Sequence, residues 1–125
     1  MSRCKQFCLA TALSVSICAS ASAGALPTRV GQCVHTSIKE IGTRLENMPG
    51  SGSAVSFKNG GDQVGYKTVP AIDHSKPGDP VRMCLVSIPR NCPKGDARGR
   101  VYRTTNLRTH QTWTMPDSAH MCGGA

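Results

Sequence analysis

Hydrophobic and polar residues alternate along most of the chain, and turn-forming sequences interrupt the alternation at short intervals. These interruptions are rich in Gly, Pro, Asn and Asp, as in "MPGSGS", "NGGD" and "HSKPGDP". Short segments with β-branched residues between such turns are typical of small β sandwiches and barrels. We therefore expect residues 24–125 to form one all-β domain, a barrel or sandwich of about six mainly antiparallel strands.

One β-hairpin is clearly indicated by "SAVSFKNGGDQVGYKTV". Val55 and Phe57 share one face of its first strand, Asn59-Gly60-Gly61 supplies a tight turn, and Val64 and Tyr66 begin the return strand. A Gly-rich loop that binds phosphate needs a helix N-terminus after it, and a strand pattern follows here. The hairpin is therefore the favoured interpretation.

Two further segments are predicted as strands with different patterns. "PVRMCLVSIP" is a nearly continuous apolar run between prolines, which predicts a central strand buried on both faces. "CVHTSIKEIGTRLE", residues 33–46, is ambiguous, because its apolar residues fall at helical spacing and Ser37 with Glu40 matches a capping box. Its β-branched residues and Gly42 favour a strand with a bulge, and one short helix is the alternative.

The arginine-rich segment "RGRVYRTTNLRTHQTW", residues 98–113, predicts a second hairpin, with His110 at a turn position that tolerates the left-handed conformation. We place Trp113 and Met115 of its return strand on the core side. Alternation then divides its first strand into two faces. The predicted core face holds Val101, Arg103, Thr105 and Leu107, and the predicted solvent face holds Arg100, Tyr102, Thr104 and Asn106.

This division disfavours nucleic-acid binding. Proteins that bind single strands combine a basic groove with exposed aromatic side chains on which bases stack. Here Trp113 is assigned to the core, so the solvated hairpin is the favoured interpretation. A small basic patch around Lys94, Arg98 and Arg100 remains as an expected docking surface for a partner.

The N-terminus has the pattern of a secretory signal peptide over residues 1–23. Arg3 and Lys5 form a positive region, an apolar run of 7–19 follows, and Ala21-Ser22-Ala23 matches a cleavage site. The apolar run is shorter than the roughly 20 residues that span a bilayer. We expect an exported product, in a bacterial periplasm or outside the cell, that begins at Gly24 and has no transmembrane segment.

Four cysteines stay in the exported product after three leave with the signal peptide. They are Cys33, Cys84, Cys92 and Cys122. An even number in an oxidising compartment predicts two disulfides, and sequence alone leaves all three connectivities open. We favour Cys84 with Cys92 as a short link and Cys33 with Cys122 as a bond that closes nearly the whole domain.

No convergent catalytic or metal-binding motif is present. The chain lacks a G-x-S-x-G elbow, and its aspartates lie in turn sequences, where Asp hydrogen-bonds its own backbone. The soft ligands of "HMC" at 120–122 and of Met83-Cys84 match no recognised copper pattern. We expect a protein without enzymatic activity, metal or cofactor.

Positive charge points to an acidic partner. Loss of Arg3 and Lys5 leaves 13 basic and 7 acidic residues, a net charge of +6. Such a balance favours nucleic acid, anionic envelope polymers, lipid headgroups or an acidic protein cleft, and for an exported protein the envelope and protein targets carry more weight.

The stretch "SGSAVSF", Ser51 to Phe57, resembles the Ser-Gly loop, followed by an aromatic residue, of the bacterial periplasmic inhibitors of c-type lysozymes. Those proteins are small exported β-barrels whose loops insert serine and lysine side chains into the acidic cleft of lysozyme. The resemblance implies that Ser51 and Ser53 carry this role, with Lys58 pairing with a carboxylate. "PGSGS" is equally well explained as a turn.

These observations favour an exported, non-catalytic binding protein of unknown partner. One alternative is a periplasmic inhibitor of a lysozyme-like hydrolase that acts through Ser51-Gly52-Ser53. The other is an envelope protein that binds polyanions.

Overall fold

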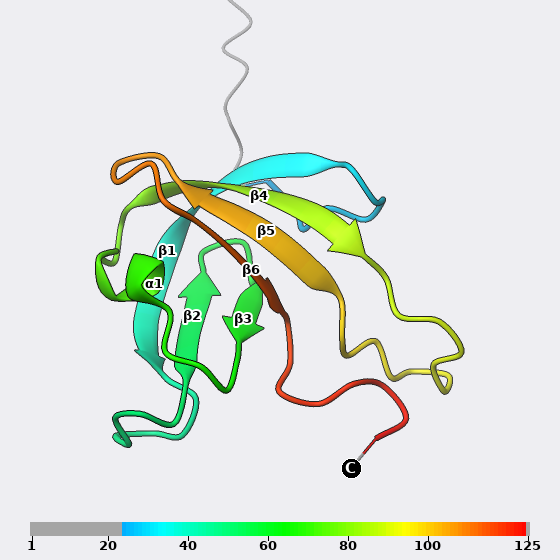
Figure 1. Ribbon diagram of the computed structural model, residues 1–125. Helices are drawn as coiled ribbons and strands as arrows, with labels where there is room; N and C mark the ends of the chain where they lie inside the picture. Colours follow the sequence, from blue (N-terminus) through cyan, green and yellow to red (C-terminus); the bar gives the residue numbers. More distant parts are fainter. Residues whose placement is uncertain (1–23, 125) are drawn as a thin grey trace, which may run out of the picture.

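The computed structural model describes residues 24–124, which form one curled antiparallel sheet with a single short helix (Figure 1). The strand order is β3-β2-β1-β4-β5-β6, and the sheet curls into a half-barrel. The elements are β1 (Cys33–Thr43), β2 (Ser53–Phe57), β3 (Asp62–Val64), α1 (Pro70–Asp73), β4 (Pro80–Ser87), β5 (Val101–Asn106) and β6 (Thr112–Pro116). The predicted all-β class is confirmed. The predicted signal peptide lies outside the described residues.

A bulge in β1 bends the sheet. The first part of β1 pairs with β4, from Cys33 opposite Cys84, and the second part pairs with β2, from Ile38 opposite Phe57. The register shifts between Ile38 and Glu40, where one extra residue is accommodated. A bulge increases local twist and lets one strand belong to two differently oriented parts of a sheet. The bulged strand is therefore confirmed for this segment.

The inner face of the sheet carries a small, mainly aliphatic core. Buried side chains alternate with partly buried ones along β2 and with exposed or partly buried ones along β4, as expected for a sheet with one solvated face. The buried hydrophobic residues are Ile38, Val55, Phe57, Ile72, Val81, Met83, Leu85, Tyr102, Trp113 and Met115. The predicted burial of Trp113 and Met115 is thus confirmed.

The prediction that β4 is buried on both faces is wrong. Val81, Met83 and Leu85 are buried, whereas Arg82 between them is exposed. The run looked continuously apolar because Cys84 and Val86 stand on the outer face, where they are only partly buried.

The predicted faces of β5 are reversed. Tyr102, Thr104 and Asn106 are buried, and Arg103 points outward. In the β5–β6 ladder, Tyr102 pairs with Met115 and Thr104 pairs with Trp113. The polar side chains are accepted inside because each finds hydrogen-bond partners there, which removes the usual cost of their burial.

The β2–β3 hairpin is confirmed, but its return strand differs from the prediction. The β3 strand is short, and its inward residue is Gln63 rather than Val64. Tyr66 lies beyond the end of the strand and is exposed, with the Arg44 guanidinium 4.2 Å from its ring centroid.

Gln63 links the two edges of the half-barrel. Its fully buried amide nitrogen donates to the carbonyl oxygens of Tyr102 at 2.8 Å and of Met115 at 3.0 Å. Its amide oxygen accepts from Thr104 Oγ1 at 2.7 Å and from Trp113 Nε1 at 2.9 Å. One side chain of β3 therefore satisfies four polar groups of β5 and β6, and no ladder hydrogen bonds join those strands to β3.

Replacing Gln63 by Leu is expected to lower the free energy of unfolding by roughly 2 to 5 kcal/mol, because buried donors and acceptors would lose their partners. Chemical unfolding followed by circular dichroism and by the fluorescence of Trp113, the single tryptophan, measures the change. The matched control is Gln111→Leu at an exposed position, where we expect less than about 0.5 kcal/mol. Equal losses in both variants would contradict the role of Gln63.

The two disulfides are present, but their pairing differs from the favoured one. Cys33 bonds Cys84, and Cys92 bonds Cys122. Cys33 and Cys84 are direct cross-strand partners in the β1–β4 ladder, with Cα atoms 4.0 Å apart. That register could not be read from the spacing of cysteines along the chain, which is why the predicted pairing is wrong.

A second buried polar cluster attaches α1 and its following loop to the β5–β6 hairpin. Arg108 donates to Asp79 through Nε at 2.7 Å and through a terminal nitrogen at 2.9 Å. Asn106 Nδ2 bonds both Asp79 and the Ser75 hydroxyl at 2.9 Å, and the Lys76 backbone N–H also donates to Asp79. The Arg108 guanidinium and these other donors hold the pKa of Asp79 well below its usual range, despite the opposing effect of burial.

This cluster predicts acid sensitivity. Because the folded-state pKa of Asp79 is depressed, its contribution to stability is complete above the unfolded value of about 3.9 and is lost as pH falls through the lower folded value. The melting temperature should therefore drop below about pH 4, and Asp79→Asn should make that drop shallower. Thermal unfolding between neutral and strongly acidic pH measures both slopes. The exposed control, Asp73→Asn, should keep the wild-type slope.

Candidate functional site

The two serines of the Ser51-Gly52-Ser53 loop use their hydroxyls inside the fold. Ser51 Oγ donates to the carbonyl of Met48 at 2.7 Å and accepts from the N–H of Leu45 at 3.1 Å. Ser53 is buried, and its Oγ accepts from the N–H of Val69 at 2.8 Å. Both hydroxyls thus fix the course of residues 44–52 and of the segment after β3.

Gly52 is required by a close backbone contact. Its φ is +121°, and a Cβ at this position would lie 1.9 Å from the carbonyl oxygen of Gly65. Only glycine fits such a conformation and such an approach. The glycine of the loop therefore also has a structural explanation.

The predicted basic residues are distributed over different parts of the molecule. Lys58 is exposed one residue beyond the far end of β2 from Ser53. At about 3.3 Å per strand residue, five residues separate it from Ser53 by roughly 16 Å. Lys94 is exposed in the long connection between β4 and β5. Arg98 lies in the same connection but is paired with Asp96 at 2.9 Å.

Arg100 is partly buried at the start of β5, beside the hydroxyl of Tyr102. Burial and the Asp117 carboxylate raise the pKa of Tyr102, and Arg100 opposes them. Of the predicted patch, only Lys94 presents an exposed charge outside an ion pair of the described residues.

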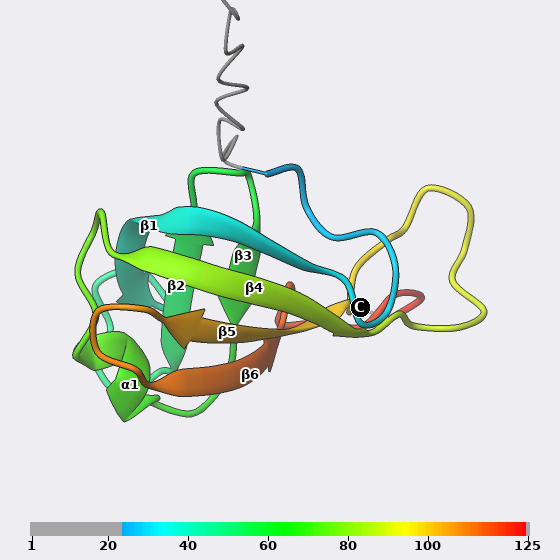
Figure 2. The same cartoon turned by 90° about the horizontal axis from the view of Figure 1, so that it is seen from above.

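The structure instead gathers basic residues on the outer face of β1, β4, β5 and β6, which lie side by side in Figure 2. His35 is opposite Arg82, Arg82 is opposite Thr105, and Arg103 is opposite Cys84. All three basic side chains are exposed. Threonines at positions 105, 112 and 114 complete the outward positions on β5 and β6, and the Cys33–Cys84 disulfide lies among them. We call this surface the basic face.

Carboxylates are absent from the strands that form the basic face. Residues 33–37 of β1 and all of β4, β5 and β6 contain no Asp or Glu. The two ion pairs among residues 24–124 join Asp79 with Arg108 and Asp96 with Arg98, so Arg82 and Arg103 belong to neither. The face therefore presents uncompensated positive charge next to threonine hydroxyls.

The sequence did not reveal this face because two arginines were assigned to buried positions. Arg103 was assigned to the core side of β5, and Arg82 was placed in a strand buried on both faces. The available signal was the spacing of Val81, Met83 and Leu85, a period of two that places Arg82 on the solvated side.

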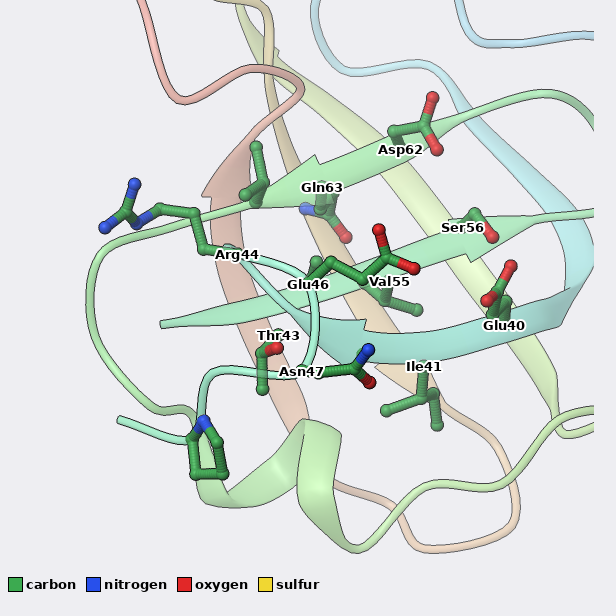
Figure 3. Close-up of a pocket in the computed structure, with 14 residues that line it drawn as sticks. Glu40, Ile41, Thr43, Arg44, Glu46, Asn47, Val55, Ser56, Asp62 and Gln63 are labelled. Atoms are coloured by element: carbon green, nitrogen blue, oxygen red, sulfur yellow. The ribbon is translucent and has the colours of Figure 1, made fainter. Parts of the chain in front are cut away.

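An open hollow lies on a different part of the sheet, where residues 44–52 stand in front of β1, β2 and β3 (Figure 3). Its volume is about 790 Å³. Figure 3 shows Glu40 and Ile41 on β1, Asp62 on β3, and Glu46 on the loop in front of them. Glu40, Glu46 and Asp62 are three of the seven carboxylates of the whole sequence. Burial and the Asp117 carboxylate raise the pKa of Asp62, and Lys39 opposes them.

Across residues 24–124, no group of three His, Cys, Asp or Glu side chains is arranged to hold a metal ion. In the same range, no helix is long and apolar enough to cross a membrane.

Comparisons with known proteins give no indication of function. No family model matches the chain, and neither a curated protein nor a solved structure matches it.

A pair of glycine substitutions tests whether the Ser-Gly loop is structural. Gly52→Ala should cost more than about 2 kcal/mol of unfolding free energy, because the new methyl group meets backbone that cannot yield. Gly50→Ala is the control, since Gly50 also has a positive φ but no atom within 4 Å of a Cβ; we expect about 1 kcal/mol. Urea unfolding measures both variants. Similar costs at the two positions would contradict the close contact.

Proposed function

We propose that this protein is an exported, non-catalytic binding protein that attaches to an anionic polymer of the cell envelope through its basic face. The observation that carries the proposal is the pair Arg82 and Arg103 on adjacent strands, exposed and with no carboxylate on β4, β5, β6 or residues 33–37 of β1. Polyanion binding was one alternative from the sequence, and the exposed charge of the basic face supports it.

The arrangement of the face suits a chain of repeated anionic groups. Arg82 and Arg103 are diagonal neighbours across β4 and β5, which places the two residues roughly 7 to 8 Å apart, with their Cβ atoms somewhat closer. Guanidinium groups bind sulfate and phosphate oxygens in a fork, and threonine hydroxyls add neutral hydrogen bonds. Because the side chains stand on strands rather than on a loop, little ordering of the protein is needed on binding.

Two disulfides in a small domain support the exported location. Disulfides persist in oxidising compartments, and small secreted domains depend on them because their cores are thin. Together with the signal-peptide pattern of residues 1–23, they are the basis for proposing a periplasmic or extracellular protein.

Inhibition of a lysozyme-like hydrolase through Ser51 and Ser53 stays a prediction from the sequence. We favour the basic face because the Ser51 and Ser53 hydroxyls already have partners within the fold. The changes Ser51→Ala and Ser53→Ala would therefore alter the loop itself as well as any contact it makes.

The proposal is tested by the binding of heparin, a soluble sulfated polymer, at several salt concentrations. Arg82→Gln with Arg103→Gln should reduce affinity at least tenfold at physiological salt and lower the slope of log K against log salt by about two. The control, Arg29→Gln with Lys76→Gln, removes the same charge at exposed positions off the face and should change the slope by less than half as much.

Equal effects of the two double variants would show that net charge alone governs binding and would overturn the basic face as the site. Binding that does not depend on salt would also overturn it, since release of counterions makes polyanion affinity fall with salt.

A further inference from the structure

The connection between β4 and β5 projects from the body of the molecule as a finger, which we define as residues 88–99. Both views show it extending beyond the ends of the strands (Figure 1 and Figure 2). Two tight turns shape it, at Asn91, with a φ of +59°, and at Gly95, with a φ of +84°. The Asp96 N–H closes the second turn on the carbonyl of Pro93 at 3.0 Å.

The finger is fixed in this shape by the C-terminal segment. The Cys92–Cys122 disulfide joins the two, and Arg98 holds Asp96 through Nε and a terminal nitrogen, both at 2.9 Å. The N–H of Gly123 also donates to Asp96 at 2.9 Å, and the N–H of Cys122 donates to the carbonyl of Arg98 at 3.0 Å. A segment ordered in advance loses little entropy when it binds.

Its exposed charge is positive. Arg90 and Lys94 are exposed and take part in neither ion pair of residues 24–124. Asp96, the single acidic residue of the finger, is neutralised by Arg98. Two large apolar side chains, Ile88 and Met121, are exposed at its base, by 39% and 55%.

The hollow has the opposite properties. It is concave, and its charged lining residues are Glu40, Glu46 and Asp62 with one arginine, Arg44. Leu45, in the loop at its rim, is 42% exposed. Met48 of the same loop is also exposed, and Tyr66 stacks on the lining residue Arg44.

The finger and the hollow therefore carry opposite charge, and exposed apolar side chains lie beside both. Among residues 24–124, seven large hydrophobic side chains are exposed. Five of them lie in or beside the finger or next to residues that line the hollow: Leu45, Met48, Tyr66, Ile88 and Met121. In both overall views the finger and residues 44–52 lie at opposite sides of the molecule, so a finger cannot enter the hollow of its own chain (Figure 1 and Figure 2).

We infer that the hollow is the docking site for the finger of a second copy of this chain. Such a contact is heterologous, because each copy uses two different surfaces, and repetition gives head-to-tail assemblies. Ion pairs of Arg90 and Lys94 with Glu40 and Glu46 would fix the register, and the apolar side chains around them would lose contact with water. The inference does not depend on polyanion binding.

The test is sedimentation equilibrium of the protein at physiological salt. The wild type should show a mean mass that rises with concentration. Arg90→Glu with Lys94→Glu should be monomeric, because the finger then repels the hollow. Glu40→Lys with Glu46→Lys should be monomeric for the converse reason. An equimolar mixture of the two variants should associate again, since each finger then faces a hollow of opposite charge.

Three controls make the result specific. Arg29→Glu with Lys76→Glu changes the same charge elsewhere and should still associate. Arg82→Gln with Arg103→Gln, which weakens heparin binding, should also associate, so the two proposals fail independently. Circular dichroism establishes that the variants are folded, and Arg90→Gln with Lys94→Gln, which should weaken association at least fivefold, replaces the reversed pair if that pair does not fold.

A wild type that remains monomeric up to about 1 mM would overturn the inference. Association that persists in either reversed variant, or a mixture that stays monomeric, would overturn it as well.

Discussion

The fold depends on the contact that Gln63 makes between the two edges of a sheet that does not close by backbone pairing. A six-stranded sheet of this size leaves two edges, at β3 and β6, and curls until they approach one another. The buried amide of Gln63 meets carbonyls of β5 and β6 and the donors of Thr104 and Trp113 at this point. A buried polar group is favourable only when its partners are all in place, so this contact demands one curvature and one register.

The bulge in β1 then divides the outside of the sheet into two surfaces. Before the bulge, the outward residue His35 stands beside Arg82 of β4; after it, the outward residue Glu40 stands beside Ser56 of β2. One strand thus contributes to the basic face with one half and to the acidic hollow with the other. The net charge of +6 over residues 24–125 conceals this separation, because three carboxylates are concentrated in the hollow and two more are neutralised by Arg108 and Arg98.

Much of the architecture could be predicted from the sequence because it rests on local patterns. The turn at Asn59 to Gly61, the left-handed His110 and the bulged β1 follow from turn chemistry and from the period of apolar residues. The cysteine pairing and the inward face of β5 depend on which strands become neighbours, and no local pattern encodes that. On β5 both faces carry polar residues, so period alone could not choose between Arg103 and Thr104 for the inside. The inward face of β5 is the one that bonds Gln63, and the partners of Gln63 on β5 are 39 and 41 positions away from it in the sequence.

The same reasoning explains why the basic face is a better indication of function than the predicted loop residues. Like charges on neighbouring strands are unfavourable, and a carboxylate opposite Arg82 or Arg103 would stabilise the sheet at no cost in packing. The chain has seven Asp and Glu residues and places none on β4, β5, β6 or residues 33–37 of β1, while Thr105 and Thr112 bond each other at 2.9 Å. Ser51, Gly52 and Ser53, in contrast, are each explained by a contact within the fold. Binding sites are expected where residues make the fold less stable than it could be and no contact within the fold explains them. The unpaired arginines on the outer surface of β4 and β5 are such residues.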